Sequence, residues 1–294
     1  MKLTLKIQLL CVLAFTLGLS ACQDVITVAV PSESPRLVIE GIIERKAGER
    51  DSAFQRIKLT QSISFFAGAR PPLVRDADVT VLSSDGQETR FAFSERDSAF
   101  VTTNLSVREG VGYRVRIRYE GDIYETAFDS ARRGGTIDSI YARQRRTNAF
   151  DTTRGLTIAV DFTDPRETRN FYFINLFRNG RNALEIEPGN QFATIRSDEF
   201  FNGQTLRGLE PEDDIIFQPG DTALVKVISI GESLFEYLRA LFIQTGQGGG
   251  GTFNPPPAPV RSNVINTTRR DRFPLGYFGV GSTSQRTLIV PRQP

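Results

Sequence analysis

Carboxylate, lysine, arginine and tyrosine side chains are the groups through which the folded part of this chain could perform catalysis. The sequence contains no histidine, and both of its cysteines, Cys11 and Cys22, lie near the N-terminus. Zinc sites built on His or Cys are therefore excluded. Nucleophile systems that depend on an imidazole base are excluded as well.

Two clusters of carboxylates are the remaining catalytic candidates. Asp161 and Asp164 stand at the end of an expected strand, and four acidic residues gather in an irregular region: Glu210, Glu212, Asp213 and Asp214. Paired carboxylates can serve glycoside hydrolysis or supply oxygen ligands to calcium. Neighbours in sequence do not establish the separation that such catalysis needs, and Asp164 before a proline also suits an ordinary turn. We therefore assign no catalytic residue and no cofactor, and keep the four acids only as calcium candidates.

The segment Leu19–Cys22 predicts where the protein is located. Residues 1–6 carry two lysines and no acid, and an almost unbroken apolar run follows to Leu19. This is the anatomy of an export signal. The cysteine directly after Leu-Ser-Ala resembles the bacterial lipobox, which implies cleavage after residue 21 and acylation of the Cys22 thiol by chains such as palmitate. The alternatives are a plain signal peptide and a short transmembrane anchor, although the apolar run is short for a membrane span.

The charge of the chain does not indicate a nucleic-acid partner. The whole sequence has a net charge of +2, and two of its lysines, Lys2 and Lys6, lie in the signal. Without them the basic residues equal the 34 acidic ones. A neutral mature chain has no global attraction for nucleic acid.

A recurrent Asp-Ser or Asp-Thr pair followed by a small or apolar residue predicts a modification. The pattern is similar to the O-glycosylation acceptor motif of exported Bacteroidota proteins. Ordinary turns before strands are the alternative explanation, because Asp and Ser favour turns. The acceptor hydroxyls would be those of Ser52, Ser98, Ser130, Ser139, Thr152 and Thr222.

The pattern of short alternating segments predicts an all-β fold. After a tether over residues 22–35, we expect an immunoglobulin-like β-sandwich over 36–130 and a second β domain over 137–294. The second domain carries one expected helix, 233–245, with an apolar stripe that favours packing onto its own sheet. A Gly- and Pro-rich loop over 246–259 follows, which is either an exposed loop or a lip over a binding site. The expected strands include 36–44, 55–60, 78–82, 89–93, 112–119, 123–128, 137–142, 156–162, 170–177, 221–230, 262–266, 275–280 and 287–290.

The clearest of these strands is Gly112–Tyr119, in which aromatic or aliphatic residues alternate with three arginines. Strict period-two alternation indicates one face in a core and the other in water. Arg114, Arg116 and Arg118 form either an anion-binding stripe or a solvated face with acidic cross-strand partners such as Glu125.

Several short motifs occur in an order that resembles a known family. The chain is similar to a Bacteroidota lipoprotein family catalogued as domain of unknown function four-two-four-nine, and the resemblance covers essentially the whole mature chain. This sequence departs from the family pattern at Arg269–Arg272, an insertion where a shorter glycine-rich approach to Gly276 is expected. The motifs are the lipobox, Leu37–Gly41, Tyr113–Ile117, Ile137–Ile140, Ser233–Leu241, Asn254 with its prolines, Ser262–Ile265 and Gly276–Gly279.

The family resemblance implies work at the outer membrane, because its members often lie near genes for SusC-like TonB-dependent receptors. It brings no catalytic residues. We expect a non-enzymatic, lipid-anchored outer-membrane protein, in the periplasmic or the surface-facing leaflet, that acts as a binding or accessory subunit beside such a transporter. The alternatives are a cell-surface hydrolase that uses carboxylates alone and a purely structural envelope protein that docks its neighbours.

Overall fold

The computed structural model describes residues 34–46, 54–64, 67–145, 154–184, 194–211, 215–246 and 260–292. The expected signal peptide, Cys22 and nearly all of the tether 22–35 lie outside these ranges, as does the expected loop 246–259 beyond Gly246. Residues Pro35–Pro294 form one compact unit, and it is this unit that is described below.

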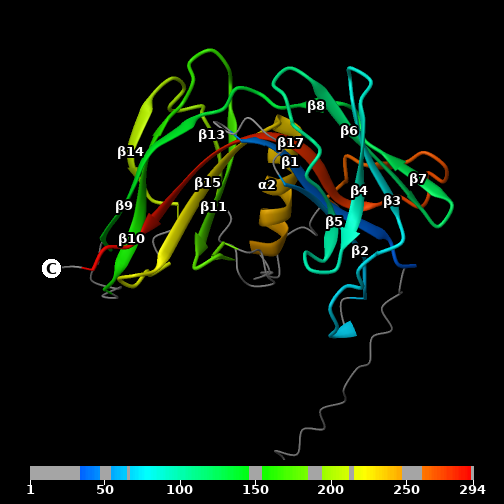
Figure 1. The fold of residues 1–294 in the computed structure, drawn as a ribbon, viewed down its shortest axis with the longest axis horizontal. Helices are drawn as coiled ribbons and strands as arrows, with labels where there is room; N and C mark the ends of the chain where they lie inside the picture. The colour runs from blue at the N-terminus through cyan, green and yellow to red at the C-terminus, as the bar shows by residue number, and fades with distance from the viewer. Residues whose placement is uncertain are drawn as a thin grey trace, which may run out of the picture. The chain divides into compact units, whose positions relative to one another are not determined.

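The described chain is all-β with one short α-helix, as the sequence predicts (Figure 1). The helix is α2 (Glu232–Gly246), close to the expected 233–245. No helix within the described ranges is both long and apolar enough to span a membrane. The strands are β1 (Leu37–Lys46), β2 (Gln55–Gln61), β3 (Asp78–Ser83), β4 (Glu88–Ser94), β5 (Ala99–Thr102), β6 (Gly112–Tyr119), β7 (Asp122–Glu125), β8 (Asp129–Ser130), β9 (Thr136–Gln144), β10 (Leu156–Thr163), β11 (Phe171–Arg178), β12 (Arg181–Asn182), β13 (Thr194–Ser197), β14 (Thr205–Leu209), β15 (Thr222–Ile230), β16 (Ile265–Asn266) and β17 (Leu275–Ile289).

The strands β1 to β7 enclose the first hydrophobic core. Alternate residues of a strand point to opposite faces, so every second side chain of β6 enters this core: Tyr113, Val115 and Ile117. Side chains of β1, β2 and β5 pack against those of β3, β6 and β7 in the same cluster, which is a sandwich arrangement. The expected strands 78–82 and 89–93 form an antiparallel hairpin as β3 and β4, with Val79 paired to Phe91.

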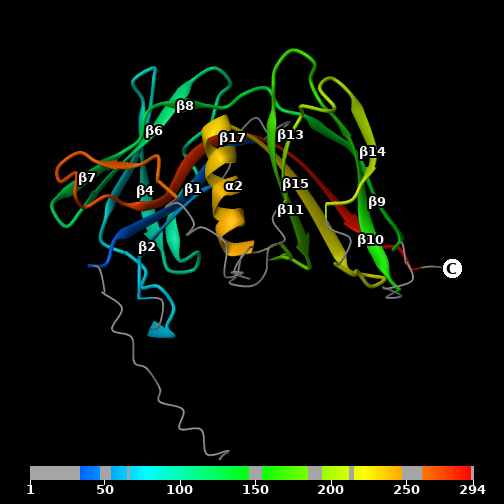
Figure 2. The same ribbon diagram turned by 180° about the vertical axis from the view of Figure 1, so that it is seen from behind.

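A second core lies between the three-stranded sheet β14-β10-β9 and the strands β11, β15 and β17. The helix α2 covers another part of the sheet, as Figure 2 shows from behind. Its buried residues Leu234 and Leu238 pack with Ile228, Ile230 and Tyr277, so the apolar stripe of the helix is used within the fold.

The last long strand, β17, connects the two cores. Its first half pairs in parallel with β1, from Val38 opposite Leu275 to Lys46 opposite Thr283. Its second half pairs antiparallel with β15, from Ser229 opposite Ser282 to Thr222 opposite Ile289. The division into domains at 36–130 and 137–294 therefore stays a prediction, because β17 and β16 place residues near the C-terminus beside strands of the first segment.

The sequence expectation of two separate strands, 275–280 and 287–290, is wrong. The structure has a single strand of 15 residues, and Ser282, Thr283 and Ser284, which lie between the two expected strands, are buried within it. The Ser282 hydroxyl donates to the Arg132 carbonyl at 2.5 Å, and the Ser284 hydroxyl accepts from the Ile137 amide at 2.9 Å. Because these polar groups have partners inside the protein, they need no exposed turn.

Candidate functional site

The calcium candidates do not form a described metal site. Glu212, Asp213 and Asp214 lie outside the described residues, so their role stays a prediction. Glu210 is described, and its carboxylate is ion-paired with Arg143 and accepts from the Thr157 hydroxyl at 3.2 Å. Within the described ranges no group of three His, Cys, Asp or Glu residues could hold a metal ion.

Asp161 and Asp164 bind separate sets of donors. The Asp161 carboxylate accepts from the Gly208 amide at 2.9 Å and from Arg207 at 3.0 Å. The Gly208 hydrogen bond is the main cause that lowers the pKa of Asp161. The buried Asp164 accepts from the Tyr172 hydroxyl and from the Gly203 amide. Burial, and then the Asp164 carboxylate, raise the pKa of Tyr172, so this phenol stays protonated and holds β11 to the end of β10.

The arginine stripe of β6 is paired with carboxylates, as expected for a solvated face with acidic cross-strand partners. Arg114 and Arg116 both form ion pairs with Glu125 on β7, and Arg118 reaches Asp78 on β3 at 3.3 Å. The stripe is therefore a cross-strand ion-pair network on a sheet face.

The expected acceptor hydroxyls are only partly described. Ser52 and Thr152 lie outside the described residues, while Ser98, Ser130, Ser139 and Thr222 are all partly exposed. Ser98 is the last residue of the β4–β5 turn and has a positive φ of 50°, and the Ser139 hydroxyl donates to Asp161 at 3.0 Å. Glycosylation at these residues stays a prediction, and an intact mass equal to polypeptide plus lipid would reject it.

The structure reveals a cavity that the sequence did not predict as a site. It has a volume of about 790 Å³, within the range of small-molecule sites. Its described lining comes from one continuous stretch, and we refer to it as the 260–275 cavity. The lining residues are Val260, Arg261, Ser262, Val264, Ile265, Asn266, Thr267, Arg270, Phe273, Pro274 and Leu275.

The short strand β16 fixes the middle of this stretch against β7. Ile265 pairs with Glu125 and Asn266 with Tyr124. The Asn266 carboxamide then organises the turn that follows, because its oxygen accepts from the amides of Thr268 and Arg269 at 3.0 and 2.8 Å. Asn and Asp side chains commonly stabilise turns in this way.

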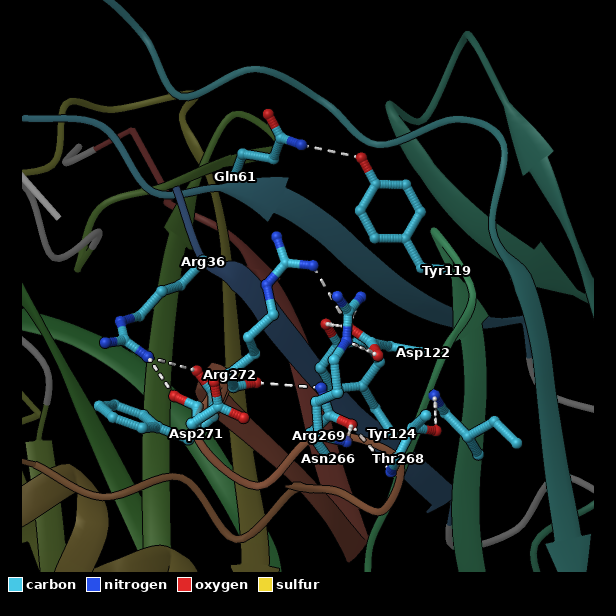
Figure 3. A network of polar contacts seen from close by, with 12 residues as sticks. Arg36, Gln61, Tyr119, Asp122, Tyr124, Asn266, Thr268, Arg269, Asp271 and Arg272 are labelled. Atoms are coloured by element: carbon cyan, nitrogen blue, oxygen red, sulfur yellow. Dashed lines mark hydrogen bonds and ion pairs between the residues drawn. The ribbon is translucent and has the colours of Figure 1, made fainter. Parts of the chain in front are cut away.

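The buried carboxylate of Asp122 anchors the same turn to the start of β7 (Figure 3). Asp122 is only 1% exposed, and it accepts two hydrogen bonds from Arg269, at 2.6 and 2.7 Å. Arg272 lies 3.6 Å from the same carboxylate. The hydrogen bonds from Arg269 are the main cause that holds the pKa of Asp122 below its usual value. A paired planar guanidinium of this kind fixes orientation as well as distance.

The far end of the stretch is held by Arg36, just before β1. Its guanidinium lies over the Phe273 ring, 3.7 Å from the ring centroid, and donates to the Phe273 carbonyl at 3.3 Å. Stacking of a cation on an aromatic face is favourable. The turn after β16 and the far end of the cavity wall are therefore held by residues that lie more than a hundred positions away in sequence.

The described lining of the cavity combines arginines that have no described ion-pair partner with exposed apolar side chains. Arg261 and Arg270 are exposed and have no ion pair or side-chain hydrogen bond to any described residue. Ile265 is 60% exposed and Phe273 is 51% exposed. The described lining holds no carboxylate, so it offers guanidinium donors and apolar contacts rather than a carboxylate pair for acid–base chemistry. One sequence signal pointed here, since Arg270 belongs to the Arg269–Arg272 insertion.

Three comparisons with known proteins were used to find the family to which the chain belongs. A search of curated proteins found no match. Among solved structures, the chain is similar to a two fibronectin type-III domain segment from chicken tenascin, with 13% identity, coverage of 67% of this chain and 91% of that chain, and a TM-score of 0.20. The sequence model of the family described as domain of unknown function (DUF4249) matches residues 23–287. Because this match spans nearly the whole chain, the chain belongs to the DUF4249 family.

Proposed function

We propose that this protein is a lipid-anchored, non-enzymatic binding protein of the outer membrane, which holds a ligand in the 260–275 cavity and works beside a TonB-dependent transporter. The observation that carries the binding role is the cavity of about 790 Å³, lined by the exposed Ile265 and Phe273 and by Arg261 and Arg270, which have no ion pair to any described residue. Exposed apolar groups beside a few convergent polar groups are typical of ligand sites.

The proposed lipid anchor and the proposed association with a transporter are supported by other observations. The anchor is inferred from the apolar run and the small residues that lead to Cys22. The transporter is inferred from the family resemblance, since SusC-like TonB-dependent receptors are its expected neighbours. The accessory role is consistent with a chain whose folded part has neither histidine nor a thiol.

Replacing Cys22 by serine should release the protein from membranes without unfolding it. The thiol is the expected site of acylation, and Cys22 precedes the compact unit Pro35–Pro294. Fractionation of cells should move the variant to the soluble fraction, with an unchanged thermal unfolding curve. Cys11→Ser is the matched control, because Cys11 lies in the expected signal peptide and its loss should leave the protein in the membrane. Retention of the Cys22→Ser variant in the membrane fraction would refute the lipid anchor.

Purification of the tagged full-length protein from its own membranes should test the binding and transport roles together. We expect a TonB-dependent receptor among the co-purified proteins. We also expect a small molecule in the organic extract that is lost from an Ile265→Asp variant, because a charge at this exposed position disrupts the apolar wall. Recovery of several other envelope proteins without a receptor would favour the structural docking alternative. An extract that is the same for both proteins would contradict ligand binding in the cavity.

A further inference from the structure

We propose that the 260–275 cavity binds an anionic amphiphile, a molecule with one carboxylate or phosphate group and an apolar body. This inference rests on the proposed binding function and specifies the chemical class of the ligand. The anionic group is held by Arg261 and Arg270, and the apolar body lies against Ile265 and Phe273.

The charge inventory of the wall favours an anion. The stretch 260–275 contains four arginines and one acid, Asp271. Asp122 is the nearby buried carboxylate, and its oxygens are taken by Arg269 and Arg272. Arg261 and Arg270 are thus left without a carboxylate partner among the described residues, although both line the cavity. A planar guanidinium matches the geometry of carboxylate and phosphate groups.

The apolar part of the wall indicates that the ligand carries an apolar body in addition to its anionic group. Val264 and Pro274 are buried parts of the wall, whereas the side chains of Ile265 and Phe273 remain more than half exposed beside the two arginines. Inorganic phosphate would leave these apolar side chains in water. An apolar body attached to the anionic group would cover them, and burial of apolar surface is favourable. The volume of about 790 Å³ has room for both parts of such a ligand.

The environment of the two arginines also argues against a cationic or a neutral ligand. A cation would be repelled by both guanidinium groups, and a neutral molecule would leave their charges uncompensated in the complex. Matched compounds that differ only in the head group therefore separate these possibilities.

Calorimetric titration of the full-length protein in nanodiscs, with empty nanodiscs as the reference, tests the ligand class. The probe is hexyl phosphate, which is compared with inorganic phosphate, hexanol and hexyltrimethylammonium. We expect saturable binding of hexyl phosphate at one site, and affinities for the other three that are weaker by about tenfold or more. Equal affinity for inorganic phosphate, or for hexyltrimethylammonium, would overturn the proposal, as would the absence of saturable binding.

Substitutions locate the site. Arg261→Gln and Arg270→Gln should each weaken hexyl phosphate binding by about tenfold, because each removes a charge-assisted hydrogen bond. Arg96→Gln is the matched control, since Arg96 is an exposed arginine on the β4–β5 turn without a side-chain partner among the described residues. Ile265→Ser should weaken hexyl phosphate and leave inorganic phosphate unchanged. An equal loss in Arg96→Gln would show that the binding is not in this cavity.

The two proposals can fail separately. A neutral or cationic molecule that co-purifies with the protein, and is lost from the Ile265→Asp variant, would support the binding function and reject the anionic amphiphile. If no molecule co-purifies and hexyl phosphate does not bind, both the binding function and the ligand class are rejected.

Discussion

The Gly276→Ala substitution is expected to destabilise the folded chain by at least about 3 kcal/mol, which would be among the severe effects of single substitutions. Gly276 has a φ of +84°, and it lies directly opposite Ile39 where β17 pairs with β1. A Cβ atom at this position would lie far inside van der Waals contact of the Ile39 carbonyl oxygen. The neighbour is backbone in the middle of a pairing, so it cannot rotate away. Urea denaturation followed by circular dichroism measures the decrease in the free energy of unfolding.

A second glycine separates the clash from the backbone strain. Gly86, in the β3–β4 turn, has a φ of +89°, and a Cβ atom there would meet nothing within 4 Å. Gly86→Ala should therefore cost only about 1 kcal/mol, the price of a positive φ for an L-residue. If both variants lost the same free energy of unfolding, the pairing of β1 with β17 would not depend on the close approach of the two backbones at Gly276.

Elements with a regular local pattern could be predicted from the sequence. The alternation in Gly112–Tyr119 predicted both the strand β6 and its buried face, and Glu125 was expected as the partner of the arginine stripe. The helix was predicted to within one residue at each end, because its apolar stripe has the period of an α-helix. In each case the signal lies within one or two consecutive elements.

Features that depend on distant pairing could not be predicted. The expected strands 275–280 and 287–290 were not predicted to be one, since nothing local shows that Arg132 and Ile137 supply partners for Ser282 and Ser284. The parallel pairing of β1 with β17 joins opposite ends of the folded unit, and parallel strands carry no hairpin signal.

The cavity was missed for the same reason. The sequence singled out Arg269–Arg272 only as a departure from a family pattern. Its structural meaning depends on Asp122, which is 147 positions away from Arg269 and is an ordinary turn residue when read locally. Whether Arg261 and Arg270 find a carboxylate partner among the described residues likewise depends on which acids the fold brings near them, and the periodicity of the sequence does not report this.

The Asp122→Asn substitution is expected to destabilise the protein by about 2 kcal/mol, since it removes charge-assisted hydrogen bonds to a buried carboxylate. Arg269 is partly exposed and can return to water, which keeps the loss below that for a fully buried pair. Asp78→Asn is the control, because Asp78 pairs with the exposed Arg90 and Arg118 and its loss should cost about 0.5 kcal/mol. Urea denaturation at pH 7 compares the two.

The pH dependence of the Asp122→Asn effect distinguishes a lost charge from a general packing defect. The pKa of Asp122 is lowered from 3.8 in the folded protein, so its carboxylate stabilises the fold above that pH. This contribution is lost as the pH falls below 3.8 and through the folded-state pKa. The difference in free energy of unfolding between the wild type and the variant should therefore be full at pH 7 and shrink at pH 3, whereas a packing defect would persist at both.

The same variant tests whether the turn must be anchored for the cavity to bind. Asp122 contacts Arg269 and Arg272 but is not part of the described lining of the cavity. A weaker affinity of Asp122→Asn for hexyl phosphate at pH 7 would therefore show that binding by Arg261 and Arg270 depends on the anchored turn.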